Sequence, residues 1–436
     1  MIIKYPERVN YENFSDENFS ETKYGLPSEV KFCKRCVESN QRPSTTIEYK
    51  HNKNSKKEAV VFDDKDVCAA CNFSLKKEKI NWEERERMLR ELCDKHRRSD
   101  GRYDCIVPGS GGKDSIYVSN LLKNEYGMHP LTVTWSPHMY TTWGRKNFDS
   151  WVHGGQDNML ITPNGKVHRL LTRLAVDVLF HPFQPFIFGQ KSLAPKIAAA
   201  MGIPLVFYGE HEAEYGSEVE NDDESIQDSK FYSDVRFEDM LLSGVPVKEL
   251  IEEFGIDKSE LQPYMPVDQN IIEDSKIEVH YFGFYKKWHP QGAYYYAVEN
   301  TNFSAAPERT VGTYSKYSSI DDKIDDFHYY TTGIKFGRAR ATEDAAQEIR
   351  SGEITREEGV ALVKKFDLEW PERFADEVFK YLSIPEKEFP IASKQFEQSI
   401  MDRGYFSNLS DSFRSPHIWK LDGKIWRLRN TVWGKG

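Results

Sequence analysis

The chain has 436 residues, 39% of them hydrophobic and 29% charged, and it carries a formal net charge of −10. This composition is typical of a soluble globular protein with two or three domains. The negative charge argues against a large nucleic-acid footprint, because phosphate binding needs basic surface. No apolar run approaches the roughly 20 residues that a membrane-spanning helix needs, so the sequence predicts no membrane segment.

Four of the six cysteines form two closely spaced pairs near the start of the chain, Cys33 with Cys36 and Cys68 with Cys71. A gap of two residues lets both thiolates reach one ion, and two such pairs close a tetrahedral four-sulfur site, which suits zinc. A redox pair or two disulfides are the alternatives. A closed shell has no free coordination position, so we expect a structural zinc. Met1–Glu7 lacks a signal-peptide pattern, and with the cysteine pattern this predicts a cytoplasmic protein.

The rest of the chain divides into three zones. Residues 1–98 would hold the zinc module and a charged linker helix over 80–98. Residues 99–310 alternate strand-like and helix-like segments, which predicts a parallel α/β sheet with helices on both faces and ligands at the carboxyl ends of its strands. Residues 311–436 are expected to form a mainly helical region.

The individual elements follow from runs of apolar residues and their period. The strand candidates are Tyr103–Val107, Leu131–Trp135 and Pro204–Tyr208. The helix candidates are Ile116–Lys123, His168–Leu179, Leu193–Met201, Glu343–Arg350, Arg356–Phe366 and Pro371–Leu382.

The most informative stretch is Ser110–Ser115, which reads Ser-Gly-Gly-Lys-Asp-Ser between a strand candidate and a helix candidate. Glycines let the backbone approach an anion, and exposed N–H groups and the helix dipole then favour negative charge. A glycine turn without a ligand is the plainer alternative. The spacing differs from a Walker A loop. It resembles the PP-loop of the ATP pyrophosphatases, which implies cleavage of ATP between its α and β phosphates to AMP and pyrophosphate.

This resemblance implies a role for each residue of the stretch. Lys113 would neutralise charge that develops on the departing pyrophosphate, and Asp114 would orient the loop or contact Mg²⁺. Together with Ser115 they are the catalytic candidates. The full set of predicted ATP-binding residues is Ser110, Gly111, Gly112, Lys113, Asp114, Ser115, Thr134, Gly209 and Glu210.

The segment that follows the third strand candidate is strongly acidic. Residues 210–228 contain nine carboxylates and no Lys or Arg. Carboxylates near ATP could hold Mg²⁺. A solvated acidic loop is the alternative, and we prefer it for most of the nine. Glu210 lies nearest the strand end and is the best metal or substrate candidate.

Three further segments offer candidate substrate contacts. Thr162–Gly165 has the residue types of a tight turn. In Tyr281–His289 the aromatic part is expected in the core, whereas the basic residues could clamp phosphate or carboxylate. Lys335–Arg340 is a basic cluster for which a solvated face is the alternative. The candidates from these segments are Asn164, Lys286, Lys287, His289 and Arg338.

Taken together, these segments resemble the N-acetyl sugar amidotransferases of bacterial surface-polysaccharide synthesis, the WbpG/PseA type. The resemblance runs from about Cys33 to Leu382. In one departure, Asn is expected where His211 stands, which leaves the role of that side chain open. The segments that carry the resemblance are the two cysteine pairs, Ser110–Ser115, Thr162–Gly165, His181–Pro185, Tyr208–Gly216, Phe284–Gln291 and Ile320–His328.

The resemblance implies the conversion of an acetamido group into an acetamidine. AMP transferred to the amide oxygen makes an O-adenylyl imidate, and ammonia then attacks the carbon and expels AMP. The substrate would be an N-acetyl sugar carried on a nucleotide, and Lys286, Lys287 and Arg338 would be natural partners for its charged groups.

The implied reaction needs a source of ammonia. A class I glutaminase needs a nucleophilic cysteine with a histidine, and the chain has no cysteine after Cys105. We therefore expect a separate HisH-like glutaminase subunit, as the resemblance implies, and a HisF-like ammonia-conducting subunit is a further candidate partner.

Two other functions fit parts of the pattern. A tRNA-thiolating enzyme can also join a PP-loop to zinc-binding cysteine pairs. Such enzymes generally use further cysteines near the ATP site, whereas this chain has none downstream of the loop and its charge is wrong for tRNA. A non-enzymatic zinc-ribbon adaptor would not need the intact Ser110–Ser115 stretch.

Overall fold

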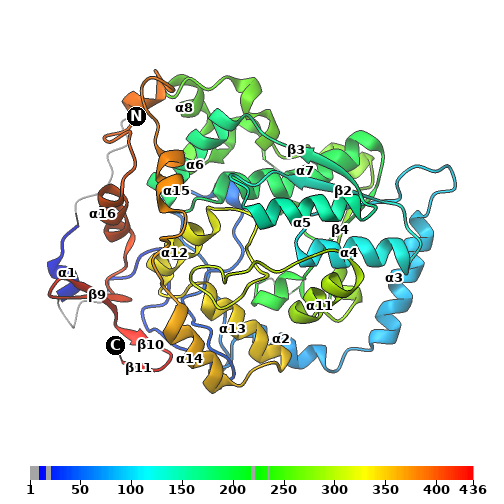
Figure 1. Cartoon of the computed structure of the whole chain (residues 1–436), viewed down its shortest axis with the longest axis horizontal. Coiled ribbons are helices and arrows are strands. Elements are labelled where there is room, and N and C mark those ends of the chain that lie inside the picture. The colour runs from blue at the N-terminus through cyan, green and yellow to red at the C-terminus, as the bar shows by residue number, and fades with distance from the viewer. Residues whose placement is uncertain (1–8, 16–20, 218–220, 234, 436) are drawn as a thin grey trace.

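The computed structural model describes residues 9–15, 21–217, 221–233 and 235–435, and these contain a five-stranded parallel sheet with helices around it (Figure 1). Met1–Glu7, used above for the localisation, lies outside these residues. The strand order is β3-β2-β1-β4-β7, and β1 pairs with both β2 and β4. The predicted parallel α/β sheet is confirmed. Its strands are β1 (Cys105–Pro108), β2 (Pro130–Trp135), β3 (Asp157–Ile161), β4 (Leu205–Tyr208) and β7 (Glu278–Tyr281).

The two faces of the sheet pack on different helices, because successive residues of a strand point to opposite sides. Ile106 and Val206 belong to a core formed with α6 (Gly165–Leu179) and α7 (Gln184–Met201). Val107 and Phe207 belong to a second core formed with α3 (Trp82–His96) and α4 (Lys113–Asn124). Strands buried on both faces need continuous apolar runs, which is why β1, β2 and β4 stand out in the sequence.

The C-terminal part of the chain is helical until about residue 413 and then turns into short antiparallel strand pairs, which the sequence did not predict. No helix among the described residues is long and apolar enough to cross a membrane. The remaining helices are α1 (Glu12–Ser15), α2 (Ala69–Lys77), α5 (Thr142–His153), α8 (Val247–Glu252), α9 (Gln269–Asp274), α10 (Phe282–Tyr285), α11 (Pro290–Asn300), α12 (Asp325–Phe336), α13 (Arg340–Ser351), α14 (Arg356–Phe366), α15 (Ala375–Leu382) and α16 (Arg403–Phe413). The paired strands are β5 (Leu241–Leu242) with β6 (Val245–Pro246), β8 (Trp419–Asp422) with β9 (Ile425–Leu428), and β10 (Asn430–Thr431) with β11 (Gly434–Lys435).

The N-terminal cysteines share a core with the C-terminal helices. The two cysteine pairs are buried together with Ala345 and Ala346 of α13 and Val363 of α14. Arg356, the first residue of α14, donates hydrogen bonds to the backbone carbonyls of Cys33 and Cys36. Figure 1 shows α2 beside α13 at one side of the molecule. The domain boundaries at residues 98 and 310 stay a prediction, but segments from the first and last zones form one core.

A buried histidine ties the last part of the chain to the N-terminal segment. The Nε2 atom of His417 lies 2.9 Å from Oε1 of Gln41, and its Nδ1 lies 2.7 Å from the hydroxyl of Ser415. Burial lowers the pKa of His417 to about 4.

This histidine should make the protein less stable in acid. The unfolded chain binds a proton at His417 near pH 6.5, whereas the folded chain resists it until about pH 4. Acidification through this window therefore favours unfolding, by an amount on the order of 3 kcal/mol at its lower end. Chemical denaturation of wild type and His417→Gln at pH 7 and pH 4.5 measures this: the variant should lose less stability between the two pH values. An equal loss in both proteins would contradict the assignment.

Candidate active site

The stretch Ser110–Ser115 forms a tight connection between β1 and α4. Gly111 has a φ of +82°, and a Cβ atom there would lie 2.7 Å from the Cα of Phe148, so only glycine fits. Gly112 is the N-cap of α4 and makes no side-chain cap, which leaves the first amides of the helix without a side-chain acceptor from the cap. The segment thus has the geometry with which helix N-termini bind anions.

Three cavities meet at Ser110. The central cavity, of about 270 Å³, extends from the loop to α12 and α13. The sheet-end cavity, of about 350 Å³, lies at the ends of β1 and β4. The aromatic cavity, of about 310 Å³, lies beyond the end of β2. Parallel sheets bind ligands at this edge, and three joined cavities here leave room for more than one large substrate.

Lys113 and Asp114 line the central cavity and form an ion pair. The Nζ atom of Lys113 lies 2.6 and 2.7 Å from the two carboxylate oxygens of Asp114. Lys113 is the first residue of α4 and only 8% exposed, so it is more deeply buried than a lysine on an open loop would be. It lies within the wall of the cavity because the helix begins one residue after Gly112.

Glu210 follows β4 and lines both the central and the sheet-end cavity, as Asp114 does. Burial, and then the charge of Asp114, raises the pKa of Glu210, while the hydroxyl of Tyr215 donates a hydrogen bond of 2.6 Å to it. Two neighbouring carboxylates that face a cavity offer oxygen ligands to a cation such as Mg²⁺.

Among the described carboxylates of the acidic segment, Glu210 alone lines the central cavity, and Glu212 lines the sheet-end cavity with it. Asp222 and Asp223 pair with Lys76 of α2, and Asp228 pairs with Lys230. Glu212 is bound by the hydroxyl of Thr45. Glu218 and Glu220 lie outside the described residues. His211 is buried and its Nδ1 accepts a hydrogen bond from the amide of Ala213, which gives it a local structural contact.

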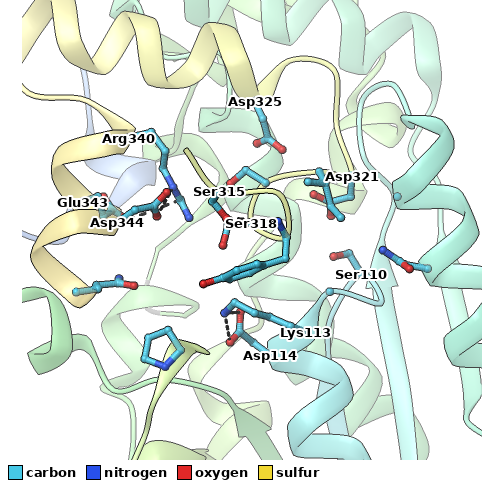
Figure 2. Close-up of a pocket in the computed structure, with 18 of the residues that line it drawn as sticks. Ser110, Lys113, Asp114, Ser315, Ser318, Asp321, Asp325, Arg340, Glu343 and Asp344 are labelled. Carbon is cyan, nitrogen blue, oxygen red and sulfur yellow. Dashed lines mark hydrogen bonds and ion pairs between the residues drawn. The ribbon is translucent and has the colours of Figure 1, made fainter. Parts of the chain in front are cut away.

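The far wall of the central cavity comes from residues that were not among the predicted site residues. Figure 2 shows Asp321, Asp325 and Arg340 around the same space as Ser110, Lys113 and Asp114. Burial raises the pKa of Asp321, and its hydrogen bond with the Ser110 side chain opposes this. Arg340 lies 2.8 Å from Asp344 and donates to the hydroxyl of Tyr329. Ile320–His328 carried part of the family resemblance, and this was the signal in the sequence for this wall.

The structure places the other predicted contacts outside the three joined cavities. Asn164 caps α6 and donates to Glu260. Thr134 is buried in β2 and accepts a hydrogen bond from Asn158. The basic residues of the predicted clamp each have an acidic partner: Lys286 pairs with Glu86, Lys287 with Glu78, and His289 with Glu353. Their roles in binding stay predictions.

Arg338 is buried and forms two hydrogen bonds, of 3.0 and 2.8 Å, with the carboxylate of Glu38. Burial by itself would raise the pKa of Glu38, but the charges of Arg338 and Arg42 bring it below its usual value. This pair joins the start of α13 to the cysteine module, so its geometry is that of a structural contact.

Removing one partner of this pair should destabilise the fold. Arg338→Ala would leave Glu38 buried beside a single cation, which typically costs about 3–5 kcal/mol. Urea denaturation measures the loss, and Arg427→Ala, at an exposed ion pair with Asp422, is the matched control that should change little. A stable Arg338→Ala protein with a weakened affinity for substrate would instead favour the predicted binding role.

The four paired cysteines form one buried cluster. Their sulfur atoms lie within 4.8 Å of one another, with 3.9 Å between Cys33 and Cys71 and 3.7 Å between Cys36 and Cys68. Disulfide sulfurs would be about 2 Å apart. Four sulfurs at zinc-ligand distance from one ion lie about 3.8 Å apart in a tetrahedron, so the cluster fits zinc. Backbone amides of Arg35, Cys36 and Cys68 point at the Cys33 sulfur and would stabilise thiolates.

Comparison with known proteins assigns the C-terminal part of the chain. Residues 311–432 match the family model described as "LPS biosynthesis protein WbpG-like, C-terminal domain". Over 77 residues the chain is 31% identical to "Uncharacterized protein MJ1599" of Methanocaldococcus jannaschii, which covers 18% of this chain and 27% of that protein. The chain therefore spans only about a quarter of that relative's length. The C-terminal match supports a relation to WbpG-type proteins of lipopolysaccharide biosynthesis.

Proposed function

We propose that the protein is an ATP-dependent amidotransferase that converts the acetamido group of a nucleotide-activated N-acetyl sugar into an acetamidine. One observation carries this proposal. The segment that matches the WbpG-like family supplies Asp321, Asp325 and Arg340 to the same cavity that the Ser110–Ser115 loop lines from the other side. A loop with the geometry of an anion site and a wall from the segment that matches the WbpG-like family thus line one space.

The loop suits the first half of the reaction. The amides at the start of α4 and the Lys113 ammonium would bind the β and γ phosphates of ATP, and Lys113 would stabilise charge on the departing pyrophosphate. The amide oxygen of the sugar attacks the α phosphorus, and the bond to the β phosphate breaks. Asp114 and Glu210 are the residues that would hold Mg²⁺, which would neutralise phosphate charge when bound.

The joined cavities suit two nucleotide-sized ligands. The aromatic cavity is lined by rings of Trp135, Phe183 and Phe186, which would stack on a nucleobase. The central cavity holds the polar groups, among which Lys113 and Arg340 are the two cations. A nucleobase in the first cavity would point its phosphates at Ser110, which lines both.

The nitrogen source in this proposal is a separate glutaminase. All six cysteines of the sequence are fully buried, and four of them form the cluster. Burial raises the pKa of Cys93 to about 12 and that of Cys105 well above its usual value, so neither is a ready nucleophile. The same facts weigh against tRNA thiolation, which needs a reactive thiol at the ATP site.

The test compares nitrogen sources. The isolated chain with ATP and a panel of nucleotide sugars should form an amidine with ammonium at alkaline pH, because free NH₃ is the nucleophile, and should fail with glutamine. Adding a HisH-like glutaminase should restore glutamine use, and a Cys→Ser change at the partner's nucleophile should remove it again. Mass spectrometry of the sugar measures amidine formation under each of these conditions. Amidine formation from glutamine by the chain alone would contradict the separate glutaminase, and failure of every arm would contradict the proposed reaction.

A further inference from the structure

A fourth, smaller cavity adjoins the central cavity on the side of the cysteine module. This side cavity has a volume of about 80 Å³ and lies between α2, the segment before α11, and the end of α13. Three residues, Tyr215, Pro290 and Gln347, line both cavities. They form a shared wall between the side cavity and the space that holds Lys113 and Asp114.

The size and chemistry of the side cavity restrict what can occupy it. Its volume is less than a third of that of each of the three joined cavities, so the side cavity suits water-sized molecules better than a nucleotide sugar. Arg350 lines the cavity, and its Nη1 is buried without a hydrogen-bond partner among the described residues. A buried donor of this kind needs an acceptor. Water and ammonia are small molecules whose lone pairs would satisfy it.

The charges of the side cavity favour a neutral guest over an ammonium ion. Lys77, Lys287 and Arg350 face two carboxylates, Glu78 and Glu214. Lys77 is 8% exposed and is held by Glu214 and by the backbone carbonyl of Trp288 at 2.9 Å. An excess of fixed cations in a partly buried space repels NH₄⁺ and leaves NH₃ unaffected.

One end of the side cavity reaches the protein surface. The side chains of Glu78, Lys287 and His289 are 61%, 46% and 36% exposed. The opposite end is the shared wall. A small molecule that entered beside Lys287 would thus cross the cavity towards the loop without passing through the opening that ATP and a sugar would fill.

We propose that the side cavity is the entrance for ammonia and that its mouth, formed by Glu78, Lys287 and His289, is where the glutaminase subunit docks. This inference rests on the proposed function. Ammonia that passes the shared wall enters the central cavity, where the imidate would form. Its lone pair forms the C–N bond, the C–O bond to AMP breaks and its electrons leave on the phosphate, and the attacking nitrogen releases a proton. Displacement of the Tyr215 or Gln347 side chain opens the passage.

The test blocks the side cavity after the protein has folded. Ser351 lines the side cavity but none of the three joined cavities. Ser351→Cys, purified in complex with the glutaminase, is treated with benzyl methanethiosulfonate, and a reductant then removes the benzyl group. Ser99→Cys, at an exposed position beyond the far end of α3, is the matched control, and treated wild type controls for the native cysteines.

The block should separate the two nitrogen sources. Glutamine-dependent amidine formation should fall by about tenfold or more, because delivery through a passage acts as a high local concentration, while ammonium-dependent formation at high concentration stays unchanged. Glutamate should then form in excess of amidine, and the reductant should restore the ratio. An unchanged ratio in the labelled Ser351→Cys complex would overturn the entrance. A wild-type complex inactive with both sources would overturn the proposed function instead. If the labelled protein loses both activities, the ratio of glutamine-dependent to ammonium-dependent amidine formation is compared between Ser351→Phe and Ser351→Ala. A lower ratio in Ser351→Phe supports the entrance, and an equal ratio overturns it.

Discussion

Lys113→Ala should reduce the sugar-dependent release of AMP and pyrophosphate by at least about 100-fold, which is the usual effect of losing one group that stabilises transition-state charge. Lys113 is the cation that the first turn of α4 brings to the loop, and its ammonium is hydrogen-bonded to the neighbouring Asp114. The measurement follows AMP and pyrophosphate separately, with circular dichroism to confirm the fold.

The control for this experiment is on the same helix. Lys123→Ala removes a lysine from the last turn of α4, where its ammonium contacts the backbone carbonyl of Gly155, away from the three joined cavities. It should keep full activity. ADP and orthophosphate as products of the wild type would refute the PP-loop assignment, whatever the variant does. Full activity of Lys113→Ala would refute the role of this side chain.

Cys36→Ser should unfold the cysteine module and, with it, loosen α13 and α14. Structural zinc contributes about 10–16 kcal/mol to the folding of isolated zinc-finger peptides. In this protein Ala345, Ala346 and Val363 also pack against the cluster. The expected result is a zinc content well below one ion per chain and a marked fall in the thermal midpoint. Metal analysis and calorimetry measure both.

Cys93→Ser is the matched control for the zinc experiment. Cys93 is as deeply buried as Cys36 but lies on α3 in the second core, outside the cluster. It should keep its zinc and lose only the modest stability that a buried hydroxyl costs. Carefully purified wild type without zinc, or with iron in its place, would contradict the metal assignment.

The strands that could be predicted from the sequence were those in the middle of the sheet. β1, β2 and β4 are buried on both faces and read as apolar runs, whereas β3 is an edge strand with exposed residues and β7 begins with Glu278. The sequence analysis missed β3 and β7, because the alternation of apolar residues and their hydrophobicity are weaker in the edge strands of a sheet. The helix that was expected from Leu193 begins at Gln184 instead, since Pro185 sits in its first turn, where proline is tolerated.

The part of the site that one continuous stretch forms could be predicted from the sequence, whereas the part that distant residues form could not. Ser110–Ser115 is one continuous stretch, so its geometry follows from its own residues. The opposite wall lies some two hundred residues later. Ile320–His328 pointed to Asp325 only through the family resemblance, and Arg340 stood out only as part of a basic cluster. Charge alone also did not show how these cations are paired: the partners of Arg338 and Lys286 are Glu38 and Glu86, which come from distant parts of the chain.

The shared core of the cysteine cluster and α13 has a consequence for the order in which the chain can fold. A ribosome completes Cys71 well before it adds Ala345, so the sulfur cluster emerges with an uncovered apolar side. The two cysteine pairs can bind their ion early in synthesis, but the helices that cover them are made only near its end. A truncated chain that ends before α13 would have a metal-bound cluster whose apolar side is exposed to solvent. The N-terminal segment can therefore complete its core only after the C-terminal helices have been synthesised and have packed against it.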